Sequence, residues 1–378
     1  MQARHPALAL GLILAAASSS HAAVISTGSA WVPPSPAPGN NRLLIGLGAG
    51  NSGSVEINGG STVSSSGDFF GSAAYVGVDG GTGTLLVTGA GSGLTMDAGN
   101  AIRIGANASN STGTVRVESG GFITTTAEAF VVGVTRAGST NNRGSVTVDN
   151  GTINVNGQNL FIGLSEGNNG SNTHGTVELT GGSTLNAPSG MRAGMGNATN
   201  SGALRVTGTG NTVNIGGSAY LNFSGGSGEI YVESGNTVNF ANLFLQGSDV
   251  GSGLPAPSGA GTIGYGITDW ATVNPIAIAG TLNLNGGGGS HLLVESFDSP
   301  APGSFSLGDT INLLTYSGQT GSNFDSVGSY FYAGNGYGFT VDQSTTATFL
   351  TVTNVPEPSR ALLVALGVAC AALRRRRS

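Results

Sequence analysis

One short pattern recurs along the middle of this chain: an apolar strand that ends in glycine. The glycines stand at positions 46, 77, 105, 133, 163 and 194, separated by 31, 28, 28, 30 and 31 residues. Two degraded copies follow, Tyr220-Leu221-Asn222 and Leu243-Phe244-Leu245-Gln246. Self-similarity at a period of about 20–50 residues indicates stacked repeats, each of which is one supersecondary unit. These eight copies constrain the fold more than any other feature of the sequence.

A second and a third strand follow the first one in these units. The second strand alternates apolar and polar residues, as in Gly113-Thr114-Val115-Arg116-Val117. This alternation predicts that Val115 and Val117 face a core while Arg116 faces solvent. A turn that contains glycine then leads to a third strand, such as Thr152-Ile153-Asn154-Val155. Three short strands per unit match one coil of a β-solenoid.

The predicted fold is all-β: a right-handed parallel β-helix, or β-solenoid, of about eight coils over residues 42–250. A single coil offers too few apolar side chains to form a core, so the coils are stable only when they stack. The asparagines at Asn154, Asn214 and Asn239 occupy equivalent positions in their coils, and we expect them to form a ladder along the stack. An up-and-down barrel is the structural alternative, but it does not explain a period of three strands.

The charge of the body restricts its partners. The chain has 67 glycines, 8% charged residues and no lysine. Residues 24–355 carry seven arginines against 18 acidic residues, a net charge of −11. This balance argues against nucleic acid or an anionic membrane as a partner of the body. The single cysteine, Cys370, lies in the C-terminal apolar segment, so the body has neither a disulfide nor a thiolate metal site.

The N-terminal 23 residues have the pattern of a secretory signal peptide. A basic start is followed by an apolar stretch from Ala7 to Ala17 and then by small residues. This order of segments is typical of a leader that is removed during export. We expect cleavage after Ala22 or Ala23.

The C-terminus has three parts in a specific order. The motif Val355-Pro356-Glu357-Pro358-Ser359 precedes an apolar run from Ala361 to Leu373 and a cluster of four arginines, Arg374, Arg375, Arg376 and Arg377. As a helix the apolar run covers roughly 20 Å, short of the ~30 Å hydrocarbon core, and flanking arginines extend its reach. Positive charge at this end predicts that the arginines stay in the cytoplasm while the body is exported.

This tail resembles the PEP-CTERM sorting signal over residues 355–378. The resemblance implies a transmembrane sorting helix in the inner membrane and a partner of the exosortase type, a membrane peptidase that recognises Pro-Glu-Pro and removes the tail. Hosts of such proteins are typically Gram-negative bacteria that make exopolysaccharide. The expected location is the cell surface or extracellular matrix, after transient membrane anchoring.

The segments that flank the repeats are less regular. We expect residues 24–41 to be a Pro-rich linker or an N-terminal cap, and residues 251–290 to be a Gly/Ser/Pro-rich connection in which Gly280 to Leu284 fits one further coil. Residues 291–354 predict a C-terminal β-cap of five strands, at Leu292–Phe297, Asp309–Leu314, Ser329–Tyr332, Tyr337–Val341 and Thr348–Val352. Its aromatic residues suit a core, and a carbohydrate-binding face is the alternative. The repeat body resembles the β-helical passenger repeats of autotransporter-type and PEP-CTERM surface proteins.

The residues that usually carry chemistry are scattered. Gly48 to Gly53 fits G-x-G-x-x-G, but no helix follows it, so it is interpreted as a turn. Acidic residues occur one or two per coil, at Glu56, Asp79, Asp97, Glu118, Asp149 and Glu178. Glu118 and Asp149 share a turn position. We interpret them as solvated turn residues, and a cation site is the alternative. His174 and His291 fall in predicted loops with no spaced metal partner. The sequence therefore predicts no catalytic site, no metal, no cofactor and no enzymatic activity.

Two function classes remain. The first is a structural or adhesive protein of the cell surface or exopolysaccharide matrix, for which a stiff rod of low charge is itself the useful object. The second is an extracellular polysaccharide-binding or polysaccharide-modifying β-helix protein.

Overall fold

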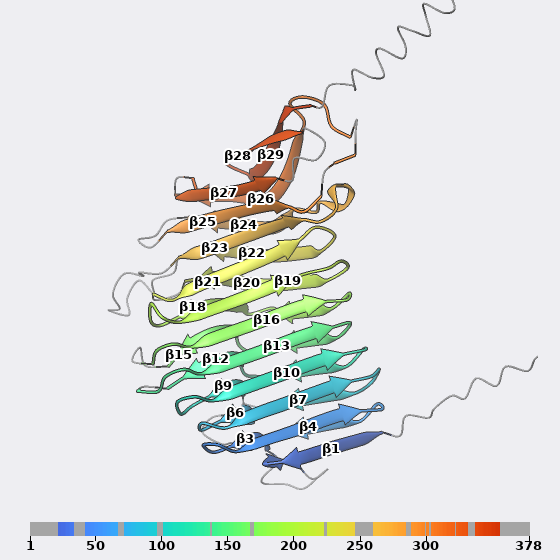
Figure 1. Ribbon diagram of the computed structural model, residues 1–378, viewed down its shortest axis with the longest axis vertical. Helices are drawn as coiled ribbons and strands as arrows, with labels where there is room; N and C mark the ends of the chain where they lie inside the picture. Colours follow the sequence, from blue (N-terminus) through green and yellow to red (C-terminus); the bar gives the residue numbers. More distant parts are fainter. Residues whose placement is uncertain are drawn as a thin grey trace, which may run out of the picture.

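The computed structural model describes residues 22–33, 42–66, 72–96, 101–136, 138–166, 170–222, 225–245, 260–284, 289–298, 300–301, 304–321, 323–331 and 337–355. The chain forms a parallel β-solenoid whose coils stack along the long axis of the molecule (Figure 1). Apart from one short 3₁₀ turn, the described regular structure consists of strands. The all-β prediction and the parallel stack are therefore confirmed.

Each regular coil contributes three strands, as the sequence predicted. The first strands are β3 (Leu43–Leu47), β6 (Ser72–Val78), β9 (Ala101–Ala106), β12 (Phe130–Thr135), β15 (Leu160–Ser165) and β18 (Gly190–Met195). The second strands are β4 (Ser52–Asn58), β7 (Thr82–Thr88), β10 (Thr112–Glu118), β13 (Arg143–Asp149), β16 (His174–Thr180), β19 (Ser201–Val206) and β21 (Ser227–Glu233). The third strands are β5 (Thr62–Ser65), β8 (Gly93–Met96), β11 (Phe122–Thr125), β14 (Thr152–Val155) and β17 (Thr184–Ala187).

Two longer strands, β20 (Thr212–Leu221) and β22 (Thr237–Phe244), each join a third strand to the first strand of the next coil. The register shifts between Ile215 and Ser218 in β20 and between Phe240 and Leu243 in β22. Here the connection is too short to leave the sheet, so the strand continues through a bulge. The regular part of the solenoid comprises about seven turns, close to the eight expected.

The strands form two sheets that face each other across one core. The second strands build an 11-stranded sheet, and the first and third strands build an 18-stranded sheet. Within the 11-stranded sheet, Val115 pairs in register with Leu85 on one side and Val146 on the other. Val115, Val117, Val146 and Val148 are all fully buried, whereas Arg116 is exposed. The predicted alternation is confirmed, and stacking turns it into continuous apolar columns.

Glycine is required where a first strand approaches the second strand of its own coil and that of the next coil. Gly77 has a φ of +69°, and a Cβ atom placed on it would overlap the carbonyl oxygen of Thr112. A Cβ atom on Gly83 would overlap the backbone nitrogen of Gly77. Only glycine provides both the left-handed conformation and the space. This explains why a glycine ends nearly every first strand and recurs near the start of every second one.

At the corners of the coils, asparagine side chains form hydrogen bonds with backbone N–H and C=O groups that the strands do not pair. The buried Asn211 accepts a hydrogen bond from the backbone N–H of Ser183 at 2.8 Å and donates one to the carbonyl of Thr207 at 2.7 Å. At another corner Asn142 accepts from the N–H of Ser111 at 3.0 Å. A buried backbone group without a partner is costly, so these amides allow a sharp turn inside the protein.

The parallel stack continues beyond residue 250. The strands β23 (Gly261–Ile267), β25 (Ser290–Ser296) and β27 (Ser326–Phe331) extend the 11-stranded sheet, and β24 (Ile276–Asn283) and β26 (Thr310–Thr320) extend the other one. Residues 261–267 fall within the Gly/Ser/Pro-rich connection expected for residues 251–290, and they form a strand of the stack. A Cβ atom on Gly264 or Gly266 would overlap Tyr231, whose ring lies over both, so glycine here makes room for an aromatic side chain.

Antiparallel strands lie at both ends of the stack. At the N-terminal end β1 (Ala23–Gly28) pairs with β4, and β2 (Ala30–Trp31) pairs with β3. Of the two interpretations of residues 24–41, the described part therefore fits a cap. At the other end β28 (Gly338–Gln343) and β29 (Ala347–Asn354) pair with each other, and β29 also pairs with the start of β26. Strands are present at all five positions predicted for residues 291–354, and β25, β27 and part of β26 belong to the parallel stack.

The C-terminal aromatic residues pack mainly against one another. Trp270, in the 3₁₀ turn η1 (Trp270–Thr272), stacks on Phe339 with ring centroids 4.6 Å apart. Phe305 meets Tyr337 edge to face at 6.0 Å, and Phe331 lies 5.2 Å from Phe339. Tyr337 is 7% exposed, whereas Tyr330 is 66% exposed. This arrangement favours the core role predicted for the cap aromatics over a binding face.

Candidate functional site

The targeting residues lie almost entirely outside the described part of the chain. Ala22 directly precedes β1, and Ala23 is the first residue of that strand. Val355 follows β29, while Pro356, Glu357, Pro358, Ser359 and the arginines Arg374 to Arg377 lie outside the described residues. Within the described ranges, no helix has the length and apolarity needed to cross a membrane. The predicted sorting helix falls on residues for which the structure gives no description.

The two histidines of the body lie on strands, so their prediction as loop residues was wrong. His174 begins β16 and its Nδ1 lies 2.8 Å from the Oγ of Ser201, its direct partner on β19. His291 on β25 repeats this arrangement with Ser326 on β27 at 2.5 Å. Because the same pairing arises twice from strand register, it serves as a cross-strand hydrogen bond. Burial, and secondarily the charge of Arg143, lower the pKa of His174 below its usual value.

Glu118 and Asp149, which were predicted to occupy equivalent positions in their coils, are register partners at the ends of β10 and β13. Glu118 also forms an ion pair with Arg116 on its own strand. Among the described residues, no group of three or more acidic, histidine or cysteine side chains is arranged to hold a metal ion. Asp97, another of the predicted acids, lies outside the described residues.

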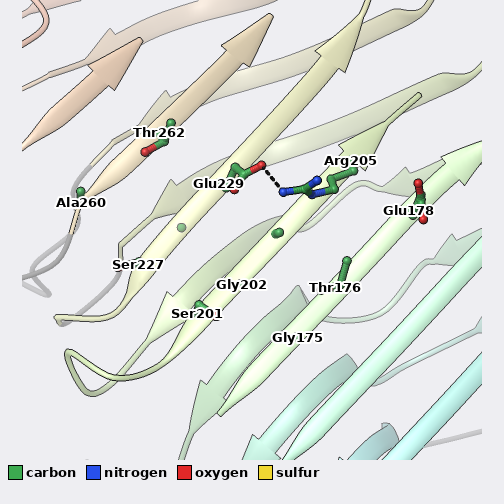
Figure 2. A pocket seen from close by; sticks show the side chains of 12 residues that line it. Gly175, Thr176, Glu178, Ser201, Gly202, Arg205, Ser227, Glu229, Ala260 and Thr262 are labelled. Atoms are coloured by element: carbon green, nitrogen blue, oxygen red, sulfur yellow. Dashed lines mark hydrogen bonds and ion pairs between the residues drawn. The ribbon is translucent and has the colours of Figure 1, made fainter. Parts of the chain in front are cut away.

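The candidate functional site is a trough of about 580 Å³ on the outer face of the 11-stranded sheet. It crosses β16, β19, β21 and β23, and most of the side chains along it are short (Figure 2). Thr176, Ala203, Glu229 and Thr262 are successive register partners, so they form one column perpendicular to the strands. Ser201 and Ser227 form a parallel column two residues earlier in the strands. The hollow exists because small outward residues coincide in adjacent coils.

Charged side chains border the trough on one side. The Nη2 of Arg205 lies 3.0 Å from the Oε1 of Glu229, and the dashed line in Figure 2 marks this contact. Glu178 stands on the far side of Arg205, and its carboxylate accepts a hydrogen bond from the Thr207 hydroxyl at 3.5 Å. Arg205 separates the two carboxylates and is paired with one of them.

Tyr231 pairs with Arg205 in the register of the sheet, next to the trough. Burial raises the pKa of Tyr231 to about 12, and the nearby carboxylates of Glu233 and Glu295 act in the same direction. The phenol therefore remains protonated at neutral pH. Together the trough residues offer hydroxyl groups and an ion pair for binding contacts.

No family model, curated protein or solved structure matches this chain. The assignment of function therefore rests on the sequence patterns and on the geometry of the solenoid. That the chain is not an enzyme stays a prediction.

The trough was not identified from the sequence. In the sequence Glu178 is one of several scattered acids, and the separation of 24 residues between Arg205 and Glu229 conceals their contact. The signal was present in the second strands, because aligning the repeats places Thr176, Ala203 and Glu229 in one column. The register partner of Arg205 on β21 is Tyr231, and Glu229 lies two residues before Tyr231. The contact between Arg205 and Glu229 is therefore diagonal, and diagonal contacts depend on side-chain conformation.

Proposed function

We propose that this protein is a structural or adhesive rod of the cell surface or extracellular matrix. The observation that carries the proposal is the unbroken parallel pairing of the 11-stranded sheet, from β4 to β27, around one apolar core. In such a stack every coil holds its neighbours by backbone hydrogen bonds along the long axis. A rod of this kind resists bending and presents the same surface columns over many coils.

The surface supports an adhesive role. Outer columns of the second and third strands carry short hydroxylated and amide side chains, and the body has few charges. Such a surface is suited to contacts with hydroxyl-rich polymers, because hydroxyls and amides both donate and accept hydrogen bonds. In this proposal the trough over β16 to β23 is one contact surface of the rod.

The delivery of the rod is proposed from the sequence. Its N-terminal leader directs export, and its tail resembles a PEP-CTERM signal, which implies anchoring in the inner membrane and release by an exosortase-type peptidase. The mature rod then remains at the surface or in an exopolysaccharide matrix.

Deletion of the gene in its source bacterium tests the adhesive role. We expect reduced cell aggregation or reduced matrix retention, restored by the full-length chain. Unchanged aggregation and matrix composition in the deletion strain would contradict the proposed function.

A second strain that carries a chain lacking residues 355–378 tests sorting separately. We expect the truncated protein to miss the final location of the full chain. The same final location for both chains would show that the tail is not a sorting signal, and would leave the adhesive role to the first experiment.

A further inference from the structure

The outward face of the first strands is unusual for a solvated sheet. Outward positions of an exposed sheet are normally polar, yet here the column perpendicular to the strands is largely apolar and aromatic. It consists of Leu44, Tyr75, Arg103, Val131, Phe161, Arg192, Tyr220 and Phe244, which are successive register partners. A column of this kind requires either a cover or a ligand.

In the N-terminal half of this column the protein itself covers Tyr75 and Val131, while Leu44 and Arg103 are partly exposed. Tyr75 is fully buried and Val131 is 2% exposed, within a second apolar cluster outside the main core. The C-terminal half is open, because Phe161, Arg192, Tyr220 and Phe244 are all partly exposed. Where the cover ends, over β9, β12, β15 and β18, lies a groove of about 470 Å³. These four strands are labelled along one side of the stack in Figure 1.

Apolar side chains and polar groups both line this outer groove. Phe161 and Met195 provide partly exposed apolar surface over the buried Val131 and Leu164. Arg103, Arg192, Glu128, Glu166 and Gln158 provide hydrogen-bonding groups. A mostly preformed hollow of roughly 300–1,000 Å³ with apolar lining and a few placed polar groups is the usual form of a ligand site. The trough on the other sheet lacks an aromatic side chain, so the groove is the better-equipped site.

The polar groups of the groove are held in place by other residues. Arg103 donates from Nε to the Ser72 hydroxyl at 2.7 Å, and its Nη1 lies 2.6 Å from Oε1 of Glu166. Glu166 also faces the Nε of Arg136 at 3.6 Å. The guanidinium of Arg192 lies 5.8 Å from the ring centroids of both Phe161 and Tyr220. These contacts reduce the conformational freedom that a ligand would otherwise have to restrict.

We propose that the outer groove binds a segment of a neutral oligosaccharide. Two arginines and two glutamates line it, so the charges balance. Carboxylates accept from sugar hydroxyls, guanidinium groups donate to them, and the Gln158 amide does both. Phe161 offers an aromatic surface to the apolar C–H side of a sugar ring. An acidic saccharide would meet Glu128 and Glu166 on a body of net charge −11. This inference goes beyond the rod function, because a rod needs no ligand site.

Calorimetric titration of the full-length chain tests the proposal. The neutral probes are cellohexaose, laminarihexaose, maltohexaose and xylohexaose, and the acidic probe is an oligogalacturonate. We expect saturable binding of at least one neutral probe, weakened by at least about tenfold in Phe161→Ala and in Gln158→Ala. Phe244→Ala is the matched control, because Phe244 belongs to the same column three coils away and does not line the groove.

Three results would overturn the inference: no saturation by a neutral probe at millimolar concentration, binding of the acidic probe alone, or equal affinity in all variants. Circular dichroism checks that each variant is folded. If Phe161→Ala is not folded, Gln158→Ala decides the outcome, since Gln158 is exposed and its loss leaves the packing intact. Failure here leaves the rod function unaffected, because that function is measured by cell aggregation.

Discussion

Asn186 donates a hydrogen bond from Nδ2 to Oδ1 of Asn154, 2.9 Å away, across 32 residues of sequence. The same bond joins Asn214 to Asn186 and Asn239 to Asn214, each at 2.9 Å. An amide both donates and accepts, so identical residues in register form a chain of bonds. Asn154, Asn214 and Asn239 were predicted to form this ladder, and Asn186 completes it. These three hydrogen bonds link four coils and favour the register in which the four asparagines are aligned.

Asn214→Ala removes two bonds from the middle of the ladder. We expect a loss of about 1–2 kcal/mol in the free energy of unfolding, because these partly buried amides lose neighbours on both sides. Denaturant unfolding followed by circular dichroism measures it. Thr124→Ala is the control, since Thr124 is the register partner of Asn154 in the preceding coil; a loss below about 0.5 kcal/mol is expected there. Equal losses in the two variants would contradict a stabilising ladder.

Asn211→Ala acts at a buried corner. It removes the acceptor of the Ser183 N–H and the donor to the Thr207 carbonyl. Because these backbone groups lose their partner inside the protein, we expect a loss of about 2–4 kcal/mol. Asn51→Ala is the matched control: the Asn51 amide donates to the carbonyl four residues earlier, that of Leu47, as Asn211 does to Thr207, but at an exposed position. The corner interpretation is wrong if both variants unfold at the same denaturant concentration.

Gly77→Ala tests the close approach of the first and second strands. The added Cβ would overlap the Thr112 carbonyl, so we expect a loss above about 3 kcal/mol or failure to fold. Gly182→Ala is the control, since Gly182 also has a positive φ, +82°, but its Cβ would have no neighbour within 4 Å. Conformational strain alone predicts about 1–2 kcal/mol there. Similar melting temperatures for the two variants would mean that steric overlap with Thr112 is not the reason for glycine at position 77.

His174 makes stability depend on pH in a defined direction. Its pKa is lowered in the folded state, so the unfolded chain binds more protons between the folded pKa and the usual value of 6.5. This contribution to stability is present above pH 6.5 and is lost as pH falls through the folded pKa. His174→Gln should therefore reduce the drop in melting temperature between about pH 8 and about pH 5. An unchanged drop in the variant would exclude His174 as its source.

Much of the fold was predictable because each coil of a solenoid repeats the same local sequence pattern. The period of the glycines predicted stacked coils, and the alternation around Val115 and Val117 predicted which side chains are buried. Interpretation from sequence failed where a residue depends on a neighbouring coil. The composition of residues 251–290 suggested a connection, yet Gly264 and Gly266 lie in β23 under the ring of Tyr231, which is 33 residues before Gly264.

The candidate sites were less predictable than the fold. Both are made of outward residues, and nothing in one coil shows whether an outward column is covered or open. Tyr75 and Phe161 occupy the same column with the same alternation, but one is fully buried and the other is partly exposed.

The sequence by itself determined the repeat, the three strands of each coil and the side of each strand that faces the core, because these depend on spacing within one coil. Tertiary structure alone decided how the outer columns are covered, that His174 meets Ser201, and where the trough and the outer groove lie. Those features arise between coils about 30 residues apart in the chain but only about 5 Å apart in space, so only the stacked structure brings their side chains together.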